Sequence, residues 1–268
     1  MFDWNAYLAG LAVLSASGVV FWLLSIAKRD VSIVDSLWSI LFVLAAITYY
    51  LILPDTGPRG LPLLILVGLW ALRLSVYITW RNWGEAEDRR YQAIRANNEP
   101  HFELKSLYIV FLLQALTAWV ISVPLLAAMT SAKAINIVDY IGVALWVLGI
   151  LFEAGGDLQL ARFKADPANR GRVLDRGLWR YTRHPNYFGN ACIWWGLGLI
   201  AAATGAWWAL LSPLLMTFLL LKVSGVSLLE RDIGERRPAY AGYAARTSAF
   251  FPWPPKSGTA VGDTVKHD

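Results

Sequence analysis

Residues 170–190 read RGRVLDRGLWRYTRHPNYFGN, and they join a strongly basic loop directly to a long apolar segment. Cations at the mouth of such a segment suit an anion such as a phosphate or a carboxylate, and Asn186 and Tyr187 add directional hydrogen bonds. Pro185 favours a helix that begins at once. The alternative is a loop whose charge only fixes membrane topology. The His-Pro-Asn-Tyr run favours a binding site, because topology alone does not require those residue types.

The rest of the chain is typical of an integral membrane protein. Hydrophobic residues make up 57% of the 268 residues, charged residues make up 16%, and there are 14 Trp. The mean hydropathy of +0.46 is too high for a soluble domain of this length. Helix-length apolar stretches recur near residues 6–27, 32–53, 60–80, 105–129, 136–160, 187–204 and 206–229. We therefore expect an all-α polytopic membrane protein with about seven transmembrane helices.

The distribution of charge predicts the topology. Most of the 24 Lys and Arg residues follow the first, third and fifth apolar stretches or lie in the C-terminal tail, whereas the opposite loops hold only Arg59 and Lys133. The positive-inside rule then places the N-terminus outside and the C-terminus in the cytoplasm. We expect residues 1–256 to form one domain and residues 257–268 to be a disordered tail. Met1–Tyr7 contains no basic residue, so we expect no cleavable signal.

Several functional classes are disfavoured. Cys192 is the single cysteine and there are three scattered His residues, so neither an intrachain disulfide nor a metal site is expected. The chain lacks a glycine-rich phosphate loop, so side chains must hold any nucleotide. Topology already accounts for the basic residues, and no nucleic-acid partner is expected.

Polar residues within the spans are candidate functional groups because their burial in a membrane is costly. Asp35 lies near the start of the second span, where it either favours the helix dipole or faces a cavity. Arg73 and Tyr77 share one face of the third span. Glu153 and Asp157 share a face of the fifth, where they either accept hydrogen bonds from ribose or amide groups or join a structural ion-pair network with the loop arginines.

Two sequence motifs resemble a known family. They are LxRGLWRYTRHPNYFG, here Leu174 to Gly189, and LxERDxxERRPAYxxYxxRTSAFFPWPPK, here Leu228 to Lys256. Together with VDSLWS in the second span and RNWGEAEDRRYQ after the third, they resemble the uncharacterised bacterial branch of the steroid 5α-reductase family. The resemblance covers almost the whole chain. It implies a bacterial inner-membrane protein with a seven-helix fold, whose cytoplasmic half binds NADPH and which reduces a carbon–carbon double bond conjugated to a carbonyl.

The charge pattern and the resemblance together predict the site. The residues expected to bind the cofactor are Glu153, Asp157, Lys164, Arg172, Arg176, Tyr181, Arg183, His184, Asn186, Tyr187, Glu230, Arg236 and Tyr243. Those expected to act on the substrate carbonyl are Asp35, kept protonated by apolar surroundings, Tyr77 and Arg73, and those expected to contact the substrate are Trp38, Trp70 and Asn190. The chain departs from the family where Val34-Asp35 replaces Gln-Glu and where Asn190 replaces Glu. The expected substrate is a lipid-soluble enone, steroid-like or isoprenoid-like.

Two alternative functions remain open. Arg-His-Pro-Asn-Tyr and a downstream Glu-Arg also resemble isoprenylcysteine methyltransferases, which use S-adenosylmethionine. The number of basic residues between 162 and 183 favours NADPH, because the methyl donor carries a sulfonium and no phosphate. The other alternative is a lipid-binding membrane protein with no catalytic activity, in which the basic loop binds anionic lipid.

Overall fold

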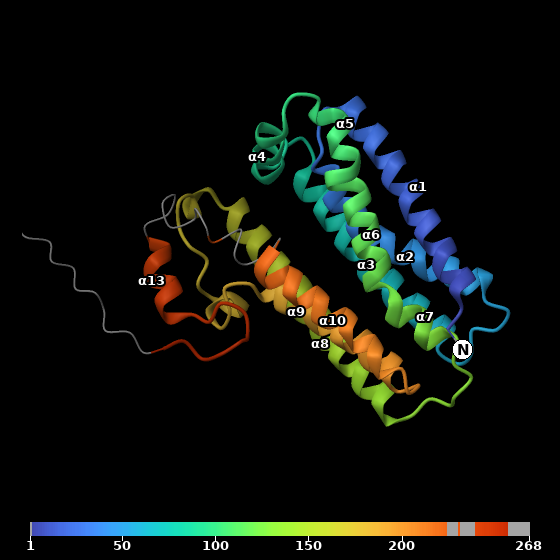
Figure 1. Ribbon diagram of the computed structural model, residues 1–268. Helices are drawn as coiled ribbons and strands as arrows, with labels where there is room; N and C mark the ends of the chain where they lie inside the picture. Colours follow the sequence, from blue (N-terminus) through green and yellow to red (C-terminus); the bar gives the residue numbers. More distant parts are fainter. Residues whose placement is uncertain (1, 224–229, 231–238, 257–268) are drawn as a thin grey trace, which may run out of the picture. The chain divides into compact units, whose positions relative to one another are not determined.

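The computed structural model describes residues 2–223, 230 and 239–256, and all regular secondary structure in these ranges is helical (Figure 1). Arg236 and the tail expected at 257–268 lie outside the described residues. The longer helices are α1 (Trp4–Lys28), α2 (Ile33–Ile52), α3 (Gly60–Asn82), α8 (Ile137–Ala165) and α9 (Pro185–Ala202). The shorter elements are α4 (Arg89–Asn98), α5 (Phe102–Ser106), η1 (Leu107–Leu112), α6 (Leu113–Ile121), α7 (Val123–Met129), η2 (Pro167–Asn169), η3 (Gly177–Arg180), η4 (Trp207–Leu210), α10 (Leu211–Phe218), η5 (Leu219–Val223) and α13 (Ala239–Arg246).

The expected apolar stretches form helices throughout the part of the chain that the structure describes. Five of the described helical segments are long and apolar enough to cross a membrane: Trp4–Lys28, Ile33–Ile52, Gly60–Asn82, Phe102–Met129 and Ile137–Ala165. The sixth expected stretch corresponds to α9, and the seventh begins with the shorter apolar run Trp207–Val223. An all-helical, multi-pass membrane protein is therefore confirmed. The count of seven spans and the orientation of the termini stay predictions.

The chain divides into two compact units. The first contains the chain up to Val143 together with Gly196–Pro213, and the second contains Ala144–Trp195 and the described residues from Leu214 onward. Within the first unit, α2 packs along α3 through serine side chains. Ser39 Oγ donates to Ala71 O at 3.0 Å, and Ser75 Oγ donates to Ser36 O at 3.0 Å. These bonds satisfy hydroxyl groups that would otherwise be costly to bury in an apolar bundle.

An aromatic cluster joins α1, α2 and α6 in the first unit. The Tyr49 hydroxyl lies 2.7 Å from Ser122 Oγ, and Tyr7 stacks on Trp119 with ring centroids 4.1 Å apart. Gly10 lies directly against the Tyr49 ring, since a Cβ atom there would lie 2.7 Å from Tyr49 Cε1. Gly10 therefore allows α1 to approach α2 closely enough to cover this ring.

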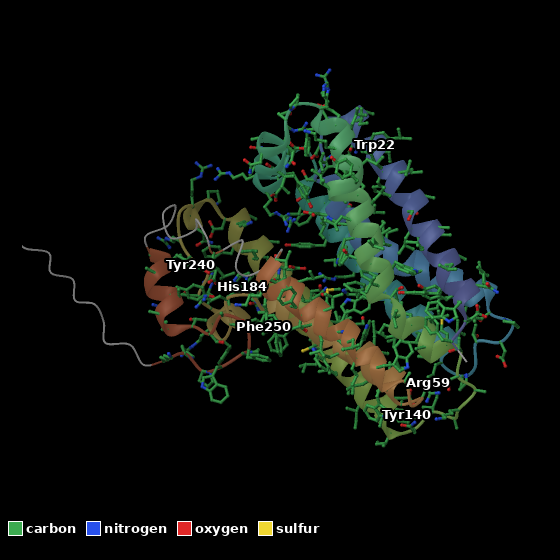
Figure 2. The ribbon with its side chains drawn as sticks, viewed as in Figure 1. Trp22, Arg59, Tyr140, His184, Tyr240 and Phe250 are labelled. Carbon is green, nitrogen blue, oxygen red and sulfur yellow. The ribbon has the colours of Figure 1, made fainter. Side chains whose placement is uncertain are left out.

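A buried ion pair holds two loops of the first unit together. Arg59, labelled in Figure 2, binds both carboxyl oxygens of Asp139, with Nε to Oδ1 at 2.7 Å and Nη2 to Oδ2 at 2.6 Å. Its remaining donors bind the carbonyl oxygens of Lys133 and Ala134 at 2.6 and 3.1 Å. Only 2% of Arg59 is exposed. The pair thus connects the residue before α3 to the first turn of α8, and the two carbonyl contacts add the segment that precedes α8.

The second unit contains most of α8, the first half of α9, the end of α10 and α13. Ala191 and Phe250 form its buried apolar cluster, and Phe188 packs edge-on against Phe250 with centroids 6.0 Å apart. Trp195 Nε1 donates to Thr217 Oγ1 at 3.1 Å, which ties α9 to α10. The C-terminal segment therefore packs back against the start of α9.

Candidate functional site

Two glycines bring α8 and α9 into backbone contact in the second unit. A Cβ atom on Gly189 would lie 2.4 Å from the Glu153 nitrogen and 2.5 Å from the Gly149 carbonyl oxygen. A Cβ atom on Gly149 would lie 2.6 Å from the Gly189 carbonyl oxygen. No side chain fits between the helices at this level, and polar side chains one turn away are brought face to face.

Two acid–amide pairs connect these helices. Asn190 Nδ2 donates to Glu153 Oε1 at 2.9 Å, and Asn186 Nδ2 donates to Asp157 Oδ1 at 3.2 Å. The two carboxylates are one turn apart on α8 and the two amides one turn apart on α9, so the pairs form successive rungs between antiparallel helices. Glu153, Asp157 and Asn190 are only 3%, 4% and 6% exposed. We call these four residues the acid–amide ladder.

One atom of the ladder is a buried acceptor that none of the described residues satisfies. Asn190 Oδ1 is buried and accepts no hydrogen bond from the described residues. The orientation of the amide follows from its neighbour, because a carboxylate oxygen of Glu153 requires the donor end of Asn190. A buried acceptor left without a donor costs about 1–3 kcal/mol, so such atoms usually mark a place where a water or a ligand binds.

The basic loop between α8 and α9 folds back onto α8. The Leu178 nitrogen donates to Gln159 Oε1 at 2.9 Å, and Trp179 Nε1 donates to the Gly156 carbonyl at 3.0 Å. Gly177 has a φ of 63°, and a Cβ atom there would lie 2.5 Å from Gln159 Oε1. Glycine is therefore required at this turn, which holds the loop beside the end of α8 that carries Asp157.

Glu230 is the centre of a second polar cluster in the same unit. Arg183 binds it with two donors, Nε to Oε1 at 2.7 Å and Nη2 to Oε2 at 2.8 Å. His184 Nε2 and the Tyr240 hydroxyl lie 2.9 and 3.0 Å from Oε1. Figure 2 labels His184, which precedes Glu230 in the sequence, and Tyr240, which follows it. Burial alone would raise the pKa of Glu230, but the hydrogen bonds from His184 and Arg183 outweigh burial and lower it to about 2.

The same cluster fastens the C-terminal segment to the His-Pro-Asn-Tyr turn. Arg183 Nη1 donates to the carbonyls of Ala244 and Thr247 at 2.9 and 2.8 Å, and the Arg183 nitrogen donates to the Ser248 carbonyl at 2.9 Å. The Tyr243 hydroxyl donates to the Trp179 carbonyl. Four residues that we expected at a cofactor thus make contacts that stabilise the fold around the turn: Arg183, His184, Glu230 and Tyr243.

The Glu230 cluster predicts a pH-dependent stability. The pKa of Glu230 is lower in the folded protein than its ordinary value of 4.5, so its contribution is fully present above pH 4.5 and is lost as the pH falls towards 2. We expect Glu230→Gln to lower the free energy of unfolding by about 1–3 kcal/mol at pH 6, and by progressively less below pH 4.5. Thermal unfolding of both proteins in detergent between pH 3 and 6 measures this difference. Asp175→Asn, which removes an exposed partner of Arg246, is the control, and a gap independent of pH would contradict the prediction.

The other residues expected at the cofactor are more exposed. Lys164, Arg172, Arg176 and Tyr181 all lie on the outside of the loop region. Tyr187 instead stacks on His184, with centroids 5.6 Å apart and planes 10° from parallel. The second unit therefore combines a buried ladder of hydrogen-bonding groups with an exposed set of cations, and further exposed arginines lie at 162, 170 and 180.

In the first unit, Asp35 binds residues that sequence reasoning missed. Arg90 Nη2 donates to Oδ2 at 2.6 Å, and the Tyr91 hydroxyl donates to Oδ1 at 2.6 Å. Burial, followed by the neighbouring Asp35, raises the pKa of Tyr91 well above 10.0, so its phenol stays a donor. Both residues belong to the RNWGEAEDRRYQ motif, and that motif was the available signal. For Asp35 to donate to a carbonyl oxygen, one of these contacts must break.

The remaining expected substrate residues lie on α2 and α3. Trp70 is fully buried and packs on Phe42 at a centroid distance of 5.7 Å, and Trp38 meets the same ring edge-on at 5.1 Å. Arg73 and Tyr77 are half-buried, one turn apart on α3, and the Arg81 guanidinium lies 5.9 Å from the Tyr77 ring. Trp70 thus belongs to the core of the first unit. Trp38, like Arg73 and Tyr77, is half-buried.

Comparison with known proteins places these sites in a family. The chain is 26% identical over 281 residues to an uncharacterised protein of the fission yeast Schizosaccharomyces pombe, with 94% of this chain and 81% of the yeast protein covered. No solved structure matches the chain. A family model described as "Protein of unknown function (DUF1295)" matches residues 21–247, a range that includes the acid–amide ladder, the Glu230 cluster and Asp35 with its partners. The chain therefore belongs to the DUF1295 family of membrane proteins.

Proposed function

We propose that the protein is a membrane reductase that uses NADPH to saturate a carbon–carbon double bond conjugated to a carbonyl in a lipid-soluble substrate. The observation that carries the proposal is the combination, in one unit, of the buried acid–amide ladder and the exposed cations of the adjoining loop. The motif resemblance to the steroid 5α-reductase family supports the same reading.

The residues of the second unit fit NADPH chemically. Phosphate groups require cations, which Lys164, Arg172 and Arg176 offer at the surface of the loop. Ribose hydroxyls require hydrogen-bonding groups, which the buried Asp157 and the half-buried Asn186 offer. In this assignment the Glu230 cluster acts indirectly, because it holds the turn from which α9 and Asn186 begin.

When bound, NADPH supplies a hydride to the β-carbon of the enone, and solvent supplies a proton to the α-carbon. The protein must stabilise the negative charge that builds on the carbonyl oxygen. Tyr77 and Arg73 each carry hydrogen-bond donors. Asp35 can take this part only if it gives up its contact with Arg90 or Tyr91. We therefore assign carbonyl polarisation first to Tyr77 and Arg73, with Asp35 fixing the neighbouring segment.

A second candidate is a methyltransferase that uses S-adenosylmethionine. It is favoured by the contact of Arg183 and His184 with Glu230, because the motif that resembles isoprenylcysteine methyltransferases contains these three residues. A third, a lipid-binding protein with no chemistry, needs only the exposed cations. The three candidates differ in which small molecule the purified protein binds.

We expect NADPH, and not S-adenosylmethionine, to raise the thermal unfolding temperature of the protein in detergent. Asp157→Ala and Arg172→Ala should each weaken NADPH binding by about tenfold or more, since each removes charge-assisted contacts. Lys28→Ala, a charge change at the end of α1, is the control and should leave the affinity unchanged. Stabilisation by the methyl donor alone would favour the second candidate, and unchanged affinity in both site variants would rule out the proposed cofactor site.

A further inference from the structure

The acid–amide ladder is not symmetrical, and the difference lies at Asn190. Both amides donate to a carboxylate, but Asn190 lies one turn further into α9 than Asn186 and is only 6% exposed. Its Oδ1 atom is buried and receives no hydrogen bond from the described residues. A carbonyl oxygen of a side-chain amide can only accept, so whatever satisfies it must present an N–H or an O–H group.

We infer that Asn190 Oδ1 accepts a hydrogen bond from the carboxamide NH₂ of the nicotinamide ring, an assignment that rests on the proposed function. Asn190 then contacts the cofactor, where the sequence had suggested the substrate. A primary amide is the donor on NADPH that belongs in the least hydrated part of the site, next to the ring that reacts. The phosphates belong with the exposed cations of the loop, on the side away from this turn of α9.

The local structure holds the Asn190 amide in the orientation that this contact requires. Glu153 fixes the donor end of the amide at 2.9 Å, which leaves Oδ1 on the other side of the group. Gly189, directly before it, has no room for a side chain against Gly149 and Glu153, so α9 packs closely on α8 beside the Asn190–Glu153 pair. The chain thus holds a buried acceptor in one orientation, as a site that selects for a donor does.

The test compares two ligands that differ at a single group. In the 3-acetylpyridine analogue of NADP⁺ a methyl group replaces the amide NH₂, so the shape and charge are kept and the donor is lost. We expect calorimetric titration of the full-length protein in detergent to show about tenfold weaker binding of the analogue than of NADP⁺. Equal affinity for the two ligands would overturn the inference, because it would mean that a water or a ribose hydroxyl satisfies Asn190.

A variant then assigns the discrimination to Asn190. Asn190→Leu removes the acceptor and should bind NADP⁺ and the analogue with equal affinity. Asn186→Ala is the matched control: it breaks the other rung of the ladder, should weaken both ligands alike, and should keep their ratio. If Asn190→Leu does not fold, Asn190→Ala removes the same acceptor and takes its place. Absence of binding by either ligand would instead contradict the proposed function itself.

Discussion

Replacing Arg59 with alanine is expected to lower the free energy of unfolding by about 3–5 kcal/mol, because it leaves the buried Asp139 carboxylate without its partner. Arg59 and Asp139 are 2% and 5% exposed, and Arg59 also satisfies two loop carbonyls. Thermal and urea unfolding in detergent, followed by tryptophan fluorescence, would measure the change. The effect should be the largest of any single charge removal outside the spans.

Two controls distinguish the loss of a buried ion pair from the loss of a charge. Arg246→Ala removes a salt bridge whose side chains are 43% and 48% exposed, and the loss should be no more than about 1 kcal/mol. The double change Arg59→Met with Asp139→Leu replaces both charges by apolar groups, and it should recover much of the stability lost in Arg59→Ala. An Arg59→Ala protein as stable as the natural one would mean that the contact is not made in the membrane.

The largest functional effect is expected from the double change Asp35→Ala with Tyr77→Phe. It removes the Tyr77 hydroxyl, which stabilises the negative charge on the carbonyl oxygen in the proposed mechanism, and the Asp35 carboxyl group, which fixes the neighbouring segment. We expect the rate of enone reduction to fall about a hundredfold or more, while the affinity for NADPH stays the same. The measurement is the loss of NADPH absorbance with an enone panel, together with product mass.

Asp35 also holds Arg90 and Tyr91, so a structural loss must be separated from a chemical one. Arg90→Ala is the matched variant, because it breaks the same ion pair and keeps the carboxyl group. If it slows turnover as much as Asp35→Ala, then Asp35 acts by positioning the loop. Unchanged turnover in the Asp35→Ala with Tyr77→Phe protein would place carbonyl polarisation elsewhere, with Arg73 the next residue to test.

The helices of this protein could be predicted well from the sequence. The first stretch was expected at 6–27 and forms α1, Trp4–Lys28, and the fifth was expected at 136–160 and forms α8, Ile137–Ala165. Length and hydropathy are sufficient for this, because a helix satisfies its own backbone groups within a membrane. Helix periodicity likewise predicted that Glu153 and Asp157 lie on one face of their helix.

Partners distant in the sequence could not be predicted in this way. Asp35 binds Arg90, 55 positions further along the chain, and Arg59 binds Asp139, 80 positions away. Helix periodicity says which residues share a face, but not which faces meet. The motif containing Arg183, His184 and Glu230 indicated that these residues belong together, yet it did not distinguish binding a ligand from binding one another. Only the geometry shows that Arg183 also binds the carbonyls of Ala244 and Thr247.

Isotope tracing tests whether the protein transfers a hydride from NADPH. The purified protein in lipid is incubated with a panel of planar, lipid-soluble enones and NADPH that carries deuterium at C4 of the nicotinamide ring, with the two C4 positions labelled in separate preparations. We expect a product that has gained one deuterium at the β-carbon from one of the two preparations and one solvent hydrogen at the α-carbon. Enones that gain no deuterium, together with transfer of a labelled methyl group from S-adenosylmethionine to a lipid acceptor, would contradict it.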